Sequence, residues 1–563
     1  MFSFASQYCK DTVSMMMTSP SVQSASATVP VSPTPTALLS VYDKTNLVPF
    51  AKALVERFGY QLLATGGTHK ALVEAGLPST EVADVTGYGE LLEGRVKSLH
   101  PEVFAGILAK RASASHMAQV SRVVDLVVVN LYPFQSGLAK VEAGDASVDL
   151  VELIDIGGSA LIRAGAKNHA DVAVVSNPLQ YEAVLVDLLA NENKTSLGLR
   201  QRLALEAFQL SAAYDNAISG WMINSLQAEL KPAELLNSLP PVLNLALHNI
   251  QPMRYGENPH QPAALYTSNP DVETFHVLHG KALSYNNILD MEAAWALISD
   301  FVELPTAAII KHTQPCGVAE APTLAQAFQQ ALDCDPLSAF GGIVALNRPV
   351  DEPTAKLLHA LFLEVIVAPG FTEEALAILT QKKNIRLVTR PTSEAQQAGK
   401  IHPAQLRDGR TIRQVSPELF LVQEQSFAVT EALLAENMKV VTSTKPSKSQ
   451  LKEAAFAWRV VKHLKSNGIA IVQGGKTVGL CGGQTSRVGA VEQAVAQACE
   501  GTTEAVLASD GFFPAVDNIQ LAAQNRIAVI IQPGGSIKDP EVIAACNQYG
   551  IAMIFTGVRE FKH

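Results

Sequence analysis

The chain alternates short apolar runs with segments of helical periodicity, and this alternation constrains its fold more than any other feature. In the first half the runs are ALLSV (37–41), YQLLATGG (60–67), DLVVVNLYPF (125–134) and DVAVVSNP (171–178). In the second half they include TAAIIKH (306–312), GGIVALN (341–347), EVIVAPG (364–370), GIAIVQGG (468–475), IAVIIQPGG (527–535) and IAMIFTG (551–557). Strands that alternate with helices form parallel sheets, so we expect α/β domains. In such sheets ligands bind beyond the carboxyl ends of the strands.

The two alternating halves are separated by a helical stretch and a proline-rich one. A chain of 563 residues is too long for a single hydrophobic core. The segment 231–244 contains three prolines, which mark a break between compact units. We therefore predict a boundary near Leu245, with one domain at 37–245 and another at 246–563.

The first 36 residues differ in composition from the rest. They are rich in Ser, Thr and Pro and carry little charge, so we expect residues 1–36 to be a disordered extension. A transit peptide is typically rich in arginine, whereas Lys10 is the only basic residue of this extension. We therefore expect a cytoplasmic protein, with a plastid location as the alternative.

Composition argues against several classes of partner. The formal net charge is −10, with 43 basic and 53 acidic residues. Blocks of Lys and Arg that could bind nucleic acid or an anionic membrane are missing from the sequence. Apolar runs fall short of the roughly 18 residues that a membrane span needs. The six cysteines form no Cys-x-x-Cys pair, so we expect reduced thiols and neither a zinc knuckle nor a disulfide framework.

Two segments of the first half could bind a phosphate. Gly66, Gly67 and Thr68 lie between a strand and a helix, where main-chain amides can form an anion cradle. Arg95 and Lys97 are two residues apart and would point the same way in an extended segment. Together they suit a phosphomonoester. A tight turn with a threonine cap and a solvated basic loop remain the alternatives.

Strand ends in the same half carry further polar side chains. Tyr132 follows the run 125–131, and Asp155 precedes a Gly-Gly-Ser sequence that is typical of a helix start. Lys167 stands near the end of that predicted helix. It could act in a site, or it could simply complement the negative end of the helix.

In the second half, the apolar run 306–310 ends on Lys311 and His312. A lysine at the end of a buried strand costs free energy unless its charge has a partner or a task. Adjacent Lys and His can supply a cation and a base for a transfer reaction. The alternative is a satisfied core histidine beside an edge lysine. The polar segment 254–266 indicates either a binding loop or a structural hinge.

Two known motifs, the P-loop and the zinc-deaminase signature, are not matched by the sequence. A P-loop needs glycine five residues before Gly475, where the chain has Ala470. A zinc deaminase needs Pro-Cys-x-x-Cys and His-x-Glu, but Cys316 is followed by Gly-Val-Ala. We therefore expect no catalytic metal.

Taken together, these segments closely resemble the bifunctional purine-biosynthesis family that joins AICAR transformylase and IMP cyclohydrolase in one chain. The matching stretches run in the family's order from about residue 37 to 563. They are LLSVYDKT, ATGGT, GRVKSLHP, NLYPF, IDIGGSALIRAGAKNHADV, RYGENPHQ, IIKHTQPCG, DPLSAFGGIVALNRPVD, KSNGIAIV, GQTSRV, SDGFFPAVDN, QPGGSIKD and GIAMIFTGVREFKH.

The resemblance implies a methylglyoxal-synthase-like, doubly wound N-terminal domain. It implies cytidine-deaminase-like α/β subdomains without zinc in the C-terminal half. The C-terminal half would transfer a formyl group from the co-substrate 10-formyltetrahydrofolate to AICAR, and the N-terminal half would close the product, FAICAR, to IMP with loss of water. The family works as a homodimer with transformylase sites at the subunit interface.

The resemblance also implies roles for particular residues. In the transformylase, His312 would be the general base, and Asn467 would donate to the formyl oxyanion. Lys311 would protonate the leaving folate nitrogen or stabilise the developing charge. AICAR would be bound by Arg254, Tyr255 and Arg559, and the folate by Phe512 and Asp517. In the cyclohydrolase, the catalytic residues would be Lys97, Tyr132, Asp155 and Lys167. The phosphate side would consist of Ser40, Lys44, Arg95, Gly66, Gly67 and Thr68.

The sequence departs from the family's pattern at a few positions. Tyr42 stands where the family usually has a small serine, which puts contacts at that end of the nucleotide site in doubt. Thr313 and Gln314 replace common asparagines, and an arginine usually found before Asp517 is missing. Two alternatives stay open from sequence: a family member with one activity, and a nucleotide-binding regulator without turnover.

Overall fold

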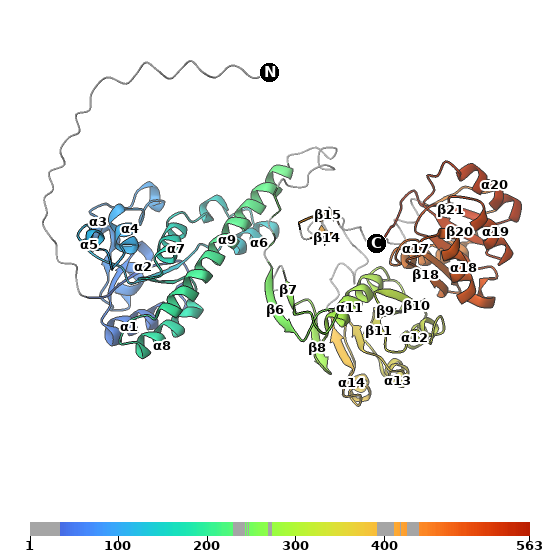
Figure 1. The fold of residues 1–563 in the computed structure, drawn as a ribbon, viewed down its shortest axis with the longest axis horizontal. Coiled ribbons are helices and arrows are strands. Elements are labelled where there is room, and N and C mark those ends of the chain that lie inside the picture. Colours follow the sequence, from blue (N-terminus) through green and yellow to red (C-terminus); the bar gives the residue numbers. More distant parts are fainter. Residues whose placement is uncertain are drawn as a thin grey trace, which may run out of the picture. The chain divides into compact units, whose positions relative to one another are not determined.

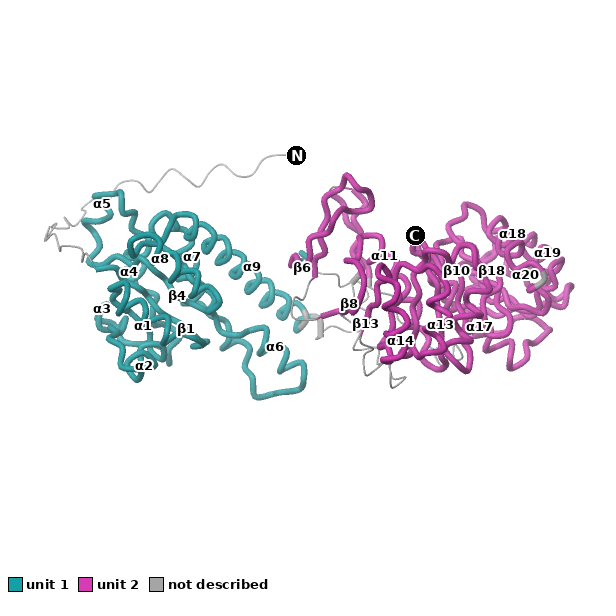
Figure 2. The backbone as a smooth tube through the Cα atoms, turned by 90° about the horizontal axis from the view of Figure 1, so that it is seen from below, with its two compact units in different colours: residues 1–246 teal, residues 247–563 magenta. Residues whose placement is uncertain are grey.

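The computed structural model divides into two compact units, residues 1–246 and 247–563 (Figures 1 and 2). It describes residues 34–228, 242–243, 245, 247–267, 273–390, 410–416, 418–424 and 438–563. Residues 1–33 of the predicted disordered extension lie outside the described residues, and the first strand begins at Thr36.

The first unit is built on a five-stranded sheet in the order β3-β2-β1-β4-β5, and every pair in it is parallel. The strands are β1 Thr36–Val41, β2 Gln61–Ala64, β3 Thr80–Glu81, β4 Leu126–Asn130 and β5 Ala173–Val175. The chain leaves β1 toward β2 and β3, then returns to the other side of β1 as β4. The order of the strands therefore reverses between β1 and β4, and a crevice opens where the connections diverge.

Helices cover both faces of this sheet (Figure 1). They are α1 Leu47–Phe58, α2 Gly66–Glu74, α3 Val82–Thr86, α4 Pro101–Leu108, α5 Ala114–Met117, α6 Phe134–Glu142, α7 Gly157–Lys167, α8 Tyr181–Ala190 and α9 Leu197–Ala228. Neighbouring strand residues belong to different cores: Leu39 and Val128 pack under α1 and α8, whereas Leu38 and Val127 pack under α4 and α7. A strand buried on both faces needs apolar residues at every position, which explains the continuous apolar runs.

The second unit has a 12-stranded sheet made of two similar halves. From one edge the order is β8-β13-β12-β11-β9-β10, and from the other it is β16-β21-β20-β19-β17-β18; the halves meet where β10 pairs with β18. In each half an antiparallel hairpin, β9–β10 or β17–β18, is followed by three parallel strands. The unit is therefore a duplication of one α/β subdomain.

The strands of the first half are β8 His276–His279, β9 Thr306–Lys311, β10 Gln314–Glu320, β11 Ile343–Leu346, β12 Val365–Ala368 and β13 Arg386–Thr389. Those of the second are β16 Lys439–Val440, β17 Ile469–Gln473, β18 Lys476–Cys481, β19 Val506–Ser509, β20 Val529–Gln532 and β21 Ala552–Phe555. Two small antiparallel pairs lie outside this sheet, β6 His248–Met253 with β7 Ala263–Thr267, and β14 Arg410–Gln414 with β15 Phe420–Glu424.

The helices repeat in the same way. The first half has α11 Tyr285–Ile298, α12 Leu324–Leu332, α13 Glu352–Ala360 and α14 Glu373–Leu379, and the second has α17 Lys448–Val461, α18 Arg487–Ala498, α19 Asp517–Gln524 and α20 Asp539–Tyr549. Helices α11 and α17 each begin with a serine capping box, at Ser284 and Ser447. Each buries a tryptophan at the same spacing from that serine, Trp295 and Trp458, in one shared core. The two helices are thus equivalent elements of the duplication.

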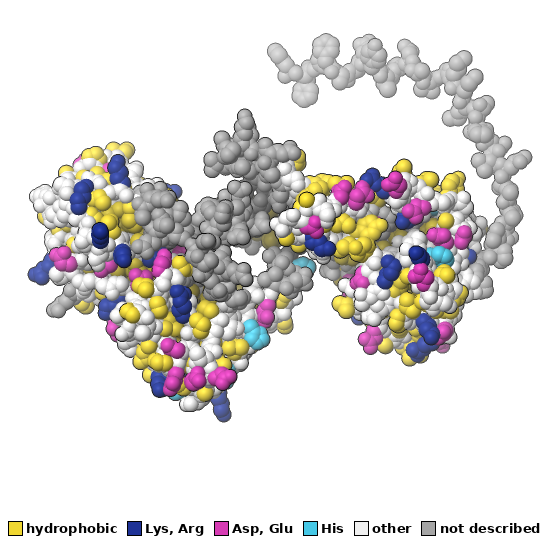
Figure 3. Space-filling view, turned by 180° about the vertical axis from the view of Figure 1, so that it is seen from behind, with side chains coloured by type: hydrophobic (Ala, Val, Ile, Leu, Met, Phe, Trp, Pro, Cys, Tyr) yellow, Lys and Arg dark blue, Asp and Glu magenta, His cyan; other side chains and the backbone are white. Residues whose placement is uncertain are grey.

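The surface carries charges of both signs. On the face that Figure 3 shows, basic and acidic side chains are interspersed over the described parts of both units. No helix in the described part of the chain is both long enough and apolar enough to cross a membrane.

Candidate active sites

The first unit holds a cavity of about 520 Å³ at the carboxyl ends of β1 and β4, where the strand order reverses. Residues of five segments line it: the end of β1, the start of α2, the loop 93–98, the end of β4 and the segment 151–158. Most of the first-half residues predicted from sequence line this cavity: Ser40, Lys44, Gly67, Thr68, Arg95, Lys97, Tyr132 and Asp155. The structure therefore brings together side chains that are separated by more than 100 positions in the sequence.

One side of the cavity is suited to an anion. Thr68, in the first turn of α2, is buried, and its hydroxyl accepts a hydrogen bond from the Val41 N–H at 3.0 Å. This bond fixes the start of α2 against the end of β1, so the positive end of the helix faces the cavity. Gly66 also borders the site, since a Cβ at Gly66 would lie 3.6 Å from the Lys97 ammonium.

Two of the cations that line the cavity, Arg95 and Lys97, are paired with carboxylates. Lys97 Nζ lies 3.2 Å from Glu90 Oε1, and the Arg95 guanidinium hydrogen-bonds to Glu152. Sequence reasoning named both cations and missed both carboxylates, because nothing in the local sequence tells which acidic residue a loop cation will meet. A bound phosphate would have to compete with Glu90 and Glu152 for these cations.

Asp155 links three parts of the site. Its Oδ1 accepts a hydrogen bond from the Gly158 N–H at 2.7 Å, and the main-chain N–H of Tyr132 also donates to this carboxyl group. Burial raises the pKa of Asp155, although these two hydrogen bonds oppose the rise. A side chain at position 158 would push the Asp155 carboxyl group away, because a Cβ there would lie only 2.5 Å from Asp155 Oδ2.

Tyr214 of α9 stabilises the segment that carries Asp155. This role of Tyr214 was not predicted from the sequence. Its hydroxyl donates to the Leu153 carbonyl and accepts from the Asp155 N–H at 3.0 Å. Its ring packs edge-on against Phe134, with centroids 6.2 Å apart. Tyr214 therefore supports the main chain at Asp155 and the turn that follows Tyr132.

The side chain of Tyr42, a departure from the family pattern, lines the same cavity. Its ring lies edge-on to that of Tyr132 at 5.5 Å, and Asn130 Oδ1 accepts hydrogen bonds from the N–H groups of Tyr42 and Asp43 at 2.7 and 2.9 Å. The larger side chain thus contacts a predicted catalytic residue directly.

Lys167 is the exception among the predicted cyclohydrolase residues. It is exposed at the last position of α7, whereas Gly157 and Gly158 at the first turn line the cavity. The 11 residues of α7 span about 15 Å, so the helix separates Lys167 from the cavity. This position at the end of α7 also fits the alternative, a cation at the negative end of a helix, and the catalytic role of Lys167 stays a prediction.

In the second unit, Lys311 ends β9 and His312 begins the two-residue turn into β10. Lys311 Nζ donates a hydrogen bond to the Phe340 carbonyl at 2.5 Å. His312 is exposed at the tip of the turn. The strand therefore delivers both side chains to one end of the sheet.

The predicted oxyanion donor lies close to this turn. Gln314, the first residue of β10, accepts a hydrogen bond from the Lys465 N–H at 3.0 Å through Oε1. Two residues further on, Asn467 Nδ2 donates to the Gln484 carbonyl at 2.9 Å. The duplication thus brings the segment before β17 to the start of β10, and with it the residues predicted for formyl transfer.

The C-terminal segment contributes the residues predicted for AICAR and folate. The Glu560 N–H donates to the Asp510 carbonyl at 3.2 Å, which places Arg559 beside the loop that carries Phe512. The Arg559 guanidinium stacks on the Phe561 ring at 4.5 Å, and both Phe512 and Asp517 are exposed. These residues therefore come from two neighbouring segments of one subdomain.

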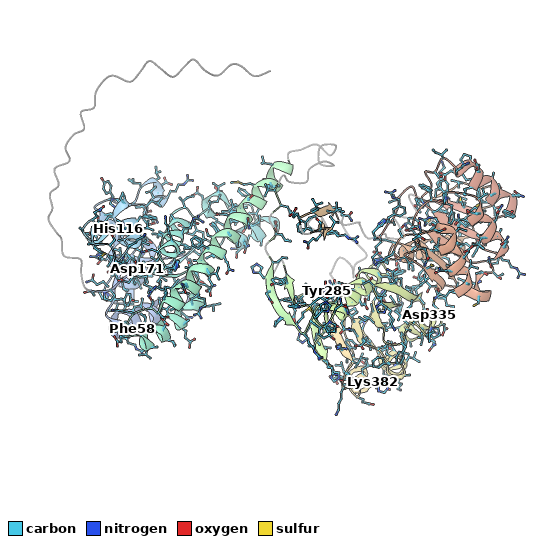
Figure 4. All side chains as sticks on the ribbon, viewed as in Figure 1. Phe58, His116, Asp171, Tyr285, Asp335 and Lys382 are labelled. Carbon is cyan, nitrogen blue, oxygen red and sulfur yellow. The ribbon has the colours of Figure 1, made fainter. Side chains whose placement is uncertain are left out.

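Arg254 and Tyr255 lie elsewhere, in the connection between β6 and β7, with the Arg254 guanidinium 5.6 Å from the Tyr255 ring. The Asn286 side chain donates to the Glu257 carbonyl at 3.3 Å, which ties this loop to the first turn of α11. Helix α11, whose first residue Tyr285 is labelled in Figure 4, thus connects the loop with the subdomain that carries Lys311.

Among the residues that the structure describes, no group of three or more His, Cys, Asp or Glu side chains is arranged to hold a metal ion.

The first unit is a parallel α/β domain with a cavity suited to a phosphate. The second is a duplicated α/β unit with a Lys-His pair at the end of a strand. Together they define an enzyme with two sites. Residues 46–160 match the model of the MGS-like domain, and residues 165–497 match that of the AICARFT/IMPCHase bienzyme. The fold class expected from sequence is therefore confirmed.

Similar proteins match this chain over nearly its whole length. The "Bifunctional purine biosynthesis protein PurH" of Halalkalibacterium halodurans is 45% identical over 94% of this chain and 99% of its own. The proteins of the same name from Cyanothece sp. and Dinoroseobacter shibae are each 46% identical over 94% of this chain, and over 100% and 98% of their own. The chain belongs to the AICARFT/IMPCHase bienzyme family. It is a bifunctional enzyme of purine biosynthesis, with AICAR formyltransferase and IMP cyclohydrolase activities.

Proposed function

We propose that residues 246–563 catalyse formyl transfer with 10-formyltetrahydrofolate as co-substrate, and that residues 37–245 catalyse ring closure. A folate-based co-substrate agrees with the formyltransferase family to which the chain belongs. The 5-amino nitrogen of AICAR forms a bond to the formyl carbon while the bond from that carbon to the folate nitrogen breaks. The products are FAICAR and tetrahydrofolate.

The amine of AICAR is a poor nucleophile because its lone pair is delocalised into the imidazole and the carboxamide. In our proposal His312 accepts the proton of this amine as it attacks, and Lys311 donates a proton to the departing folate nitrogen. Asn467 donates a hydrogen bond to the oxyanion. Arg254, Tyr255 and Arg559 bind AICAR, and Phe512 and Asp517 contact the folate.

In the cyclohydrolase, the carboxamide nitrogen of FAICAR attacks the formyl carbon, and the formyl oxygen leaves as water. The start of α2, with Ser40, Lys44 and Arg95 nearby, binds the phosphate. Lys97 stabilises the developing oxyanion, while Tyr132 and Asp155 carry protons. The observation that carries this proposal is the cavity that gathers these residues at the reversal of strand order. Lys167 does not line this cavity, and its part in ring closure stays a prediction.

His312→Ala tests the transformylase half. We expect formyl transfer to fall by about 10²- to 10⁴-fold, since a general base contributes that much to a proton-transfer step. Closure of FAICAR should continue at the wild-type rate. Absorbance-monitored turnover of AICAR with 10-formyltetrahydrofolate, then of FAICAR alone, measures both. Full formyl transfer by the variant would show that the Lys-His pair is structural, and failure of the wild type on one substrate would reveal a single-activity member.

We also propose that neither reaction requires a catalytic metal, because the acid, base and oxyanion roles are assigned to side chains. Dialysis against EDTA should leave both rates unchanged, and a loss restored by one divalent cation would refute this.

We further propose a cytoplasmic homodimer. Sedimentation equilibrium tests the dimer, and a fluorescent fusion of the full chain distinguishes the cytoplasm from a plastid.

A further inference from the structure

The duplication places two equivalent hairpin turns in the second unit, and only one carries reactive side chains. The turn between β9 and β10 is His312–Thr313, and the turn between β17 and β18 is Gly474–Gly475. Their φ angles are positive at both positions, 52° and 62° in the first turn and 63° and 75° in the second. Such two-residue turns strongly favour Asn-Gly or Gly-Gly, so the glycine turn is the ordinary solution for this hairpin.

The His312–Thr313 turn adopts the same conformation with less suitable residues. Left-handed backbone is uncommon for residues other than glycine, and for a β-branched residue such as Thr313 it is a true outlier. Strained backbone of this kind persists only where the surrounding structure holds it, and it occurs preferentially at functional sites. The His312–Thr313 turn therefore needs stabilising contacts from its surroundings more than a glycine turn does.

Asp290 of α11 provides that support. Its Oδ1 accepts a hydrogen bond from the Thr313 N–H at 2.7 Å, and its Oδ2 accepts one from the His312 N–H at 3.3 Å. One carboxylate thus satisfies both main-chain donors of the turn. Asp290 is itself placed by α11, which begins at the Ser284 capping box and is anchored in the core by Trp295.

The second half contains the counterpart of this contact. Glu453 stands at the same spacing from Ser447 on α17 as Asp290 does from Ser284 on α11. Its Oε1 accepts a single hydrogen bond, at 3.2 Å, from the Gly474 N–H. Both halves therefore have a carboxylate that accepts a hydrogen bond from the hairpin turn. In the turn that carries His312, the carboxylate accepts from two main-chain N–H groups.

We propose that Asp290 is a positioning residue for formyl transfer. By fixing both N–H groups of the strained turn, it sets the direction of the His312 side chain relative to Lys311, whose ammonium is held by the Phe340 carbonyl. This inference rests on the proposed role of His312 as the general base. Asp290 takes no proton in the reaction and acts through the turn.

Asp290→Asn is the first test. Asparagine has nearly the same shape, but its amide can accept from only one of the two N–H groups and turns its own donors toward the other. We expect kcat of formyl transfer to fall by about 10- to 100-fold, as misplacement of a catalytic group does. The KM for AICAR should change by less than about twofold, because the substrate-binding residues are untouched. Cyclohydrolase activity of the same protein should be unchanged and reports that the chain is folded.

Glu453→Gln is the matched control, because it alters the equivalent contact in the half whose turn is Gly474–Gly475. It should leave formyl transfer within about twofold of the wild type. Thermal unfolding of both variants is compared. Equal losses of formyl transfer in the Asp290 and Glu453 variants would mean that the carboxylates only stabilise the sheet, which would overturn the inference.

Two further variants separate positioning from folding. Asp290→Glu keeps the charge and should retain more activity than Asp290→Asn. Adding Thr313→Gly to Asp290→Asn should recover part of kcat, because glycine adopts the left-handed conformation without strain. No recovery in either variant would contradict a positioning role.

His312→Ala distinguishes the failure of this inference from that of the proposed function. If His312→Ala loses formyl transfer while Asp290→Asn keeps full kcat, the positioning role is wrong and the role of His312 stands. If His312→Ala keeps full activity, the proposed function of His312 fails, and the inference about Asp290 fails with it.

Discussion

At the scale of single residues, Asp155 shows how burial and function oppose each other. Its carboxyl group is partly buried at the wall of the cavity, and this burial raises its pKa, against the hydrogen bonds from Gly158 and Tyr132. A folded-state pKa above the unfolded value means that the protonated group favours folding. The stabilisation is complete below the ordinary value of 3.8 and is lost as the pH rises through the raised pKa, so the ionised group costs stability at pH 7.

Asp155→Asn should therefore separate activity from stability. We expect cyclohydrolase activity to fall by about 10²- to 10⁴-fold, because the proton-carrying group is lost. The unfolding temperature at pH 7 should change little, since the loss of a partly buried charge offsets the hydrogen bond that the asparagine amide cannot accept from the second N–H group. Calorimetry and FAICAR closure measure the two effects. An unfolding temperature that drops by several degrees would make Asp155 a structural residue.

At the scale of elements, α11 and α17 are joined by a buried ionic cluster just beyond their ends. Asp300 Oδ2 lies 2.7 Å from His463 Nε2 and 3.4 Å from Lys462 Nζ. Asp300 and His463 follow Trp295 and Trp458 at the same spacing, so two equivalent positions of the duplication pair with each other. Burial acts to raise the pKa of Asp300, but the hydrogen bond from His463 and the charge of Lys462 outweigh it, and the pKa is lowered; burial also lowers the pKa of His463, which acts here chiefly as a hydrogen-bond donor.

Asp300→Ala should destabilise the second unit. Removal of one partner of a buried ion pair typically costs about 3–5 kcal/mol, because the remaining charge stays buried. The folded-state pKa of Asp300 is lowered, so its stabilisation is present above the ordinary value of 3.8 and is lost as the pH falls through the lowered pKa. The stability difference between wild type and variant should shrink below about pH 4. Denaturant unfolding at pH 7 and at pH 3 tests this, and a difference independent of pH would contradict it.

At the scale of the whole molecule, the two activities belong to units with separate cores. The hydrophobic clusters of residues 37–210 and those of residues 283–554 share no member. Each unit therefore buries its own apolar surface, and we expect FAICAR to be made and closed at two separate sites.

Two full-length variants should complement each other in a mixture. Lys97→Met should convert AICAR only as far as FAICAR, and His312→Ala should close FAICAR but not make it. Mixed together, they should form IMP from AICAR after a lag in which free FAICAR accumulates. Chromatography of the reaction over time measures the lag. Accumulation of FAICAR without IMP would mean that the intermediate passes between sites only within one intact protein.

The local sequence was enough to find the longer buried strands and most of the residues that line the first site. The runs 37–41 and 125–134 contain β1 and β4, because strands buried on both faces leave an unbroken apolar signal. Residues that follow such runs, such as Thr68 and Tyr132, could be expected at one edge of the sheet before any tertiary contact was known. The roles assigned to them came from the resemblance to a family, which depends on motif order along the chain.

The tertiary structure decided which distant residues meet. Glu90, Glu152 and Tyr214 reach the first site, and Asp290 reaches the His312 turn, through contacts that leave no periodic or local signal in the sequence. Lys167 could be placed on a helix from sequence, but only the direction of α7 put it at the end away from the cavity. The pattern of apolar residues predicts helices and strands, because each residue's tendency to be buried can be read at its own position in the sequence. Pairing of polar groups depends on distances between elements, which exist only once the chain has folded.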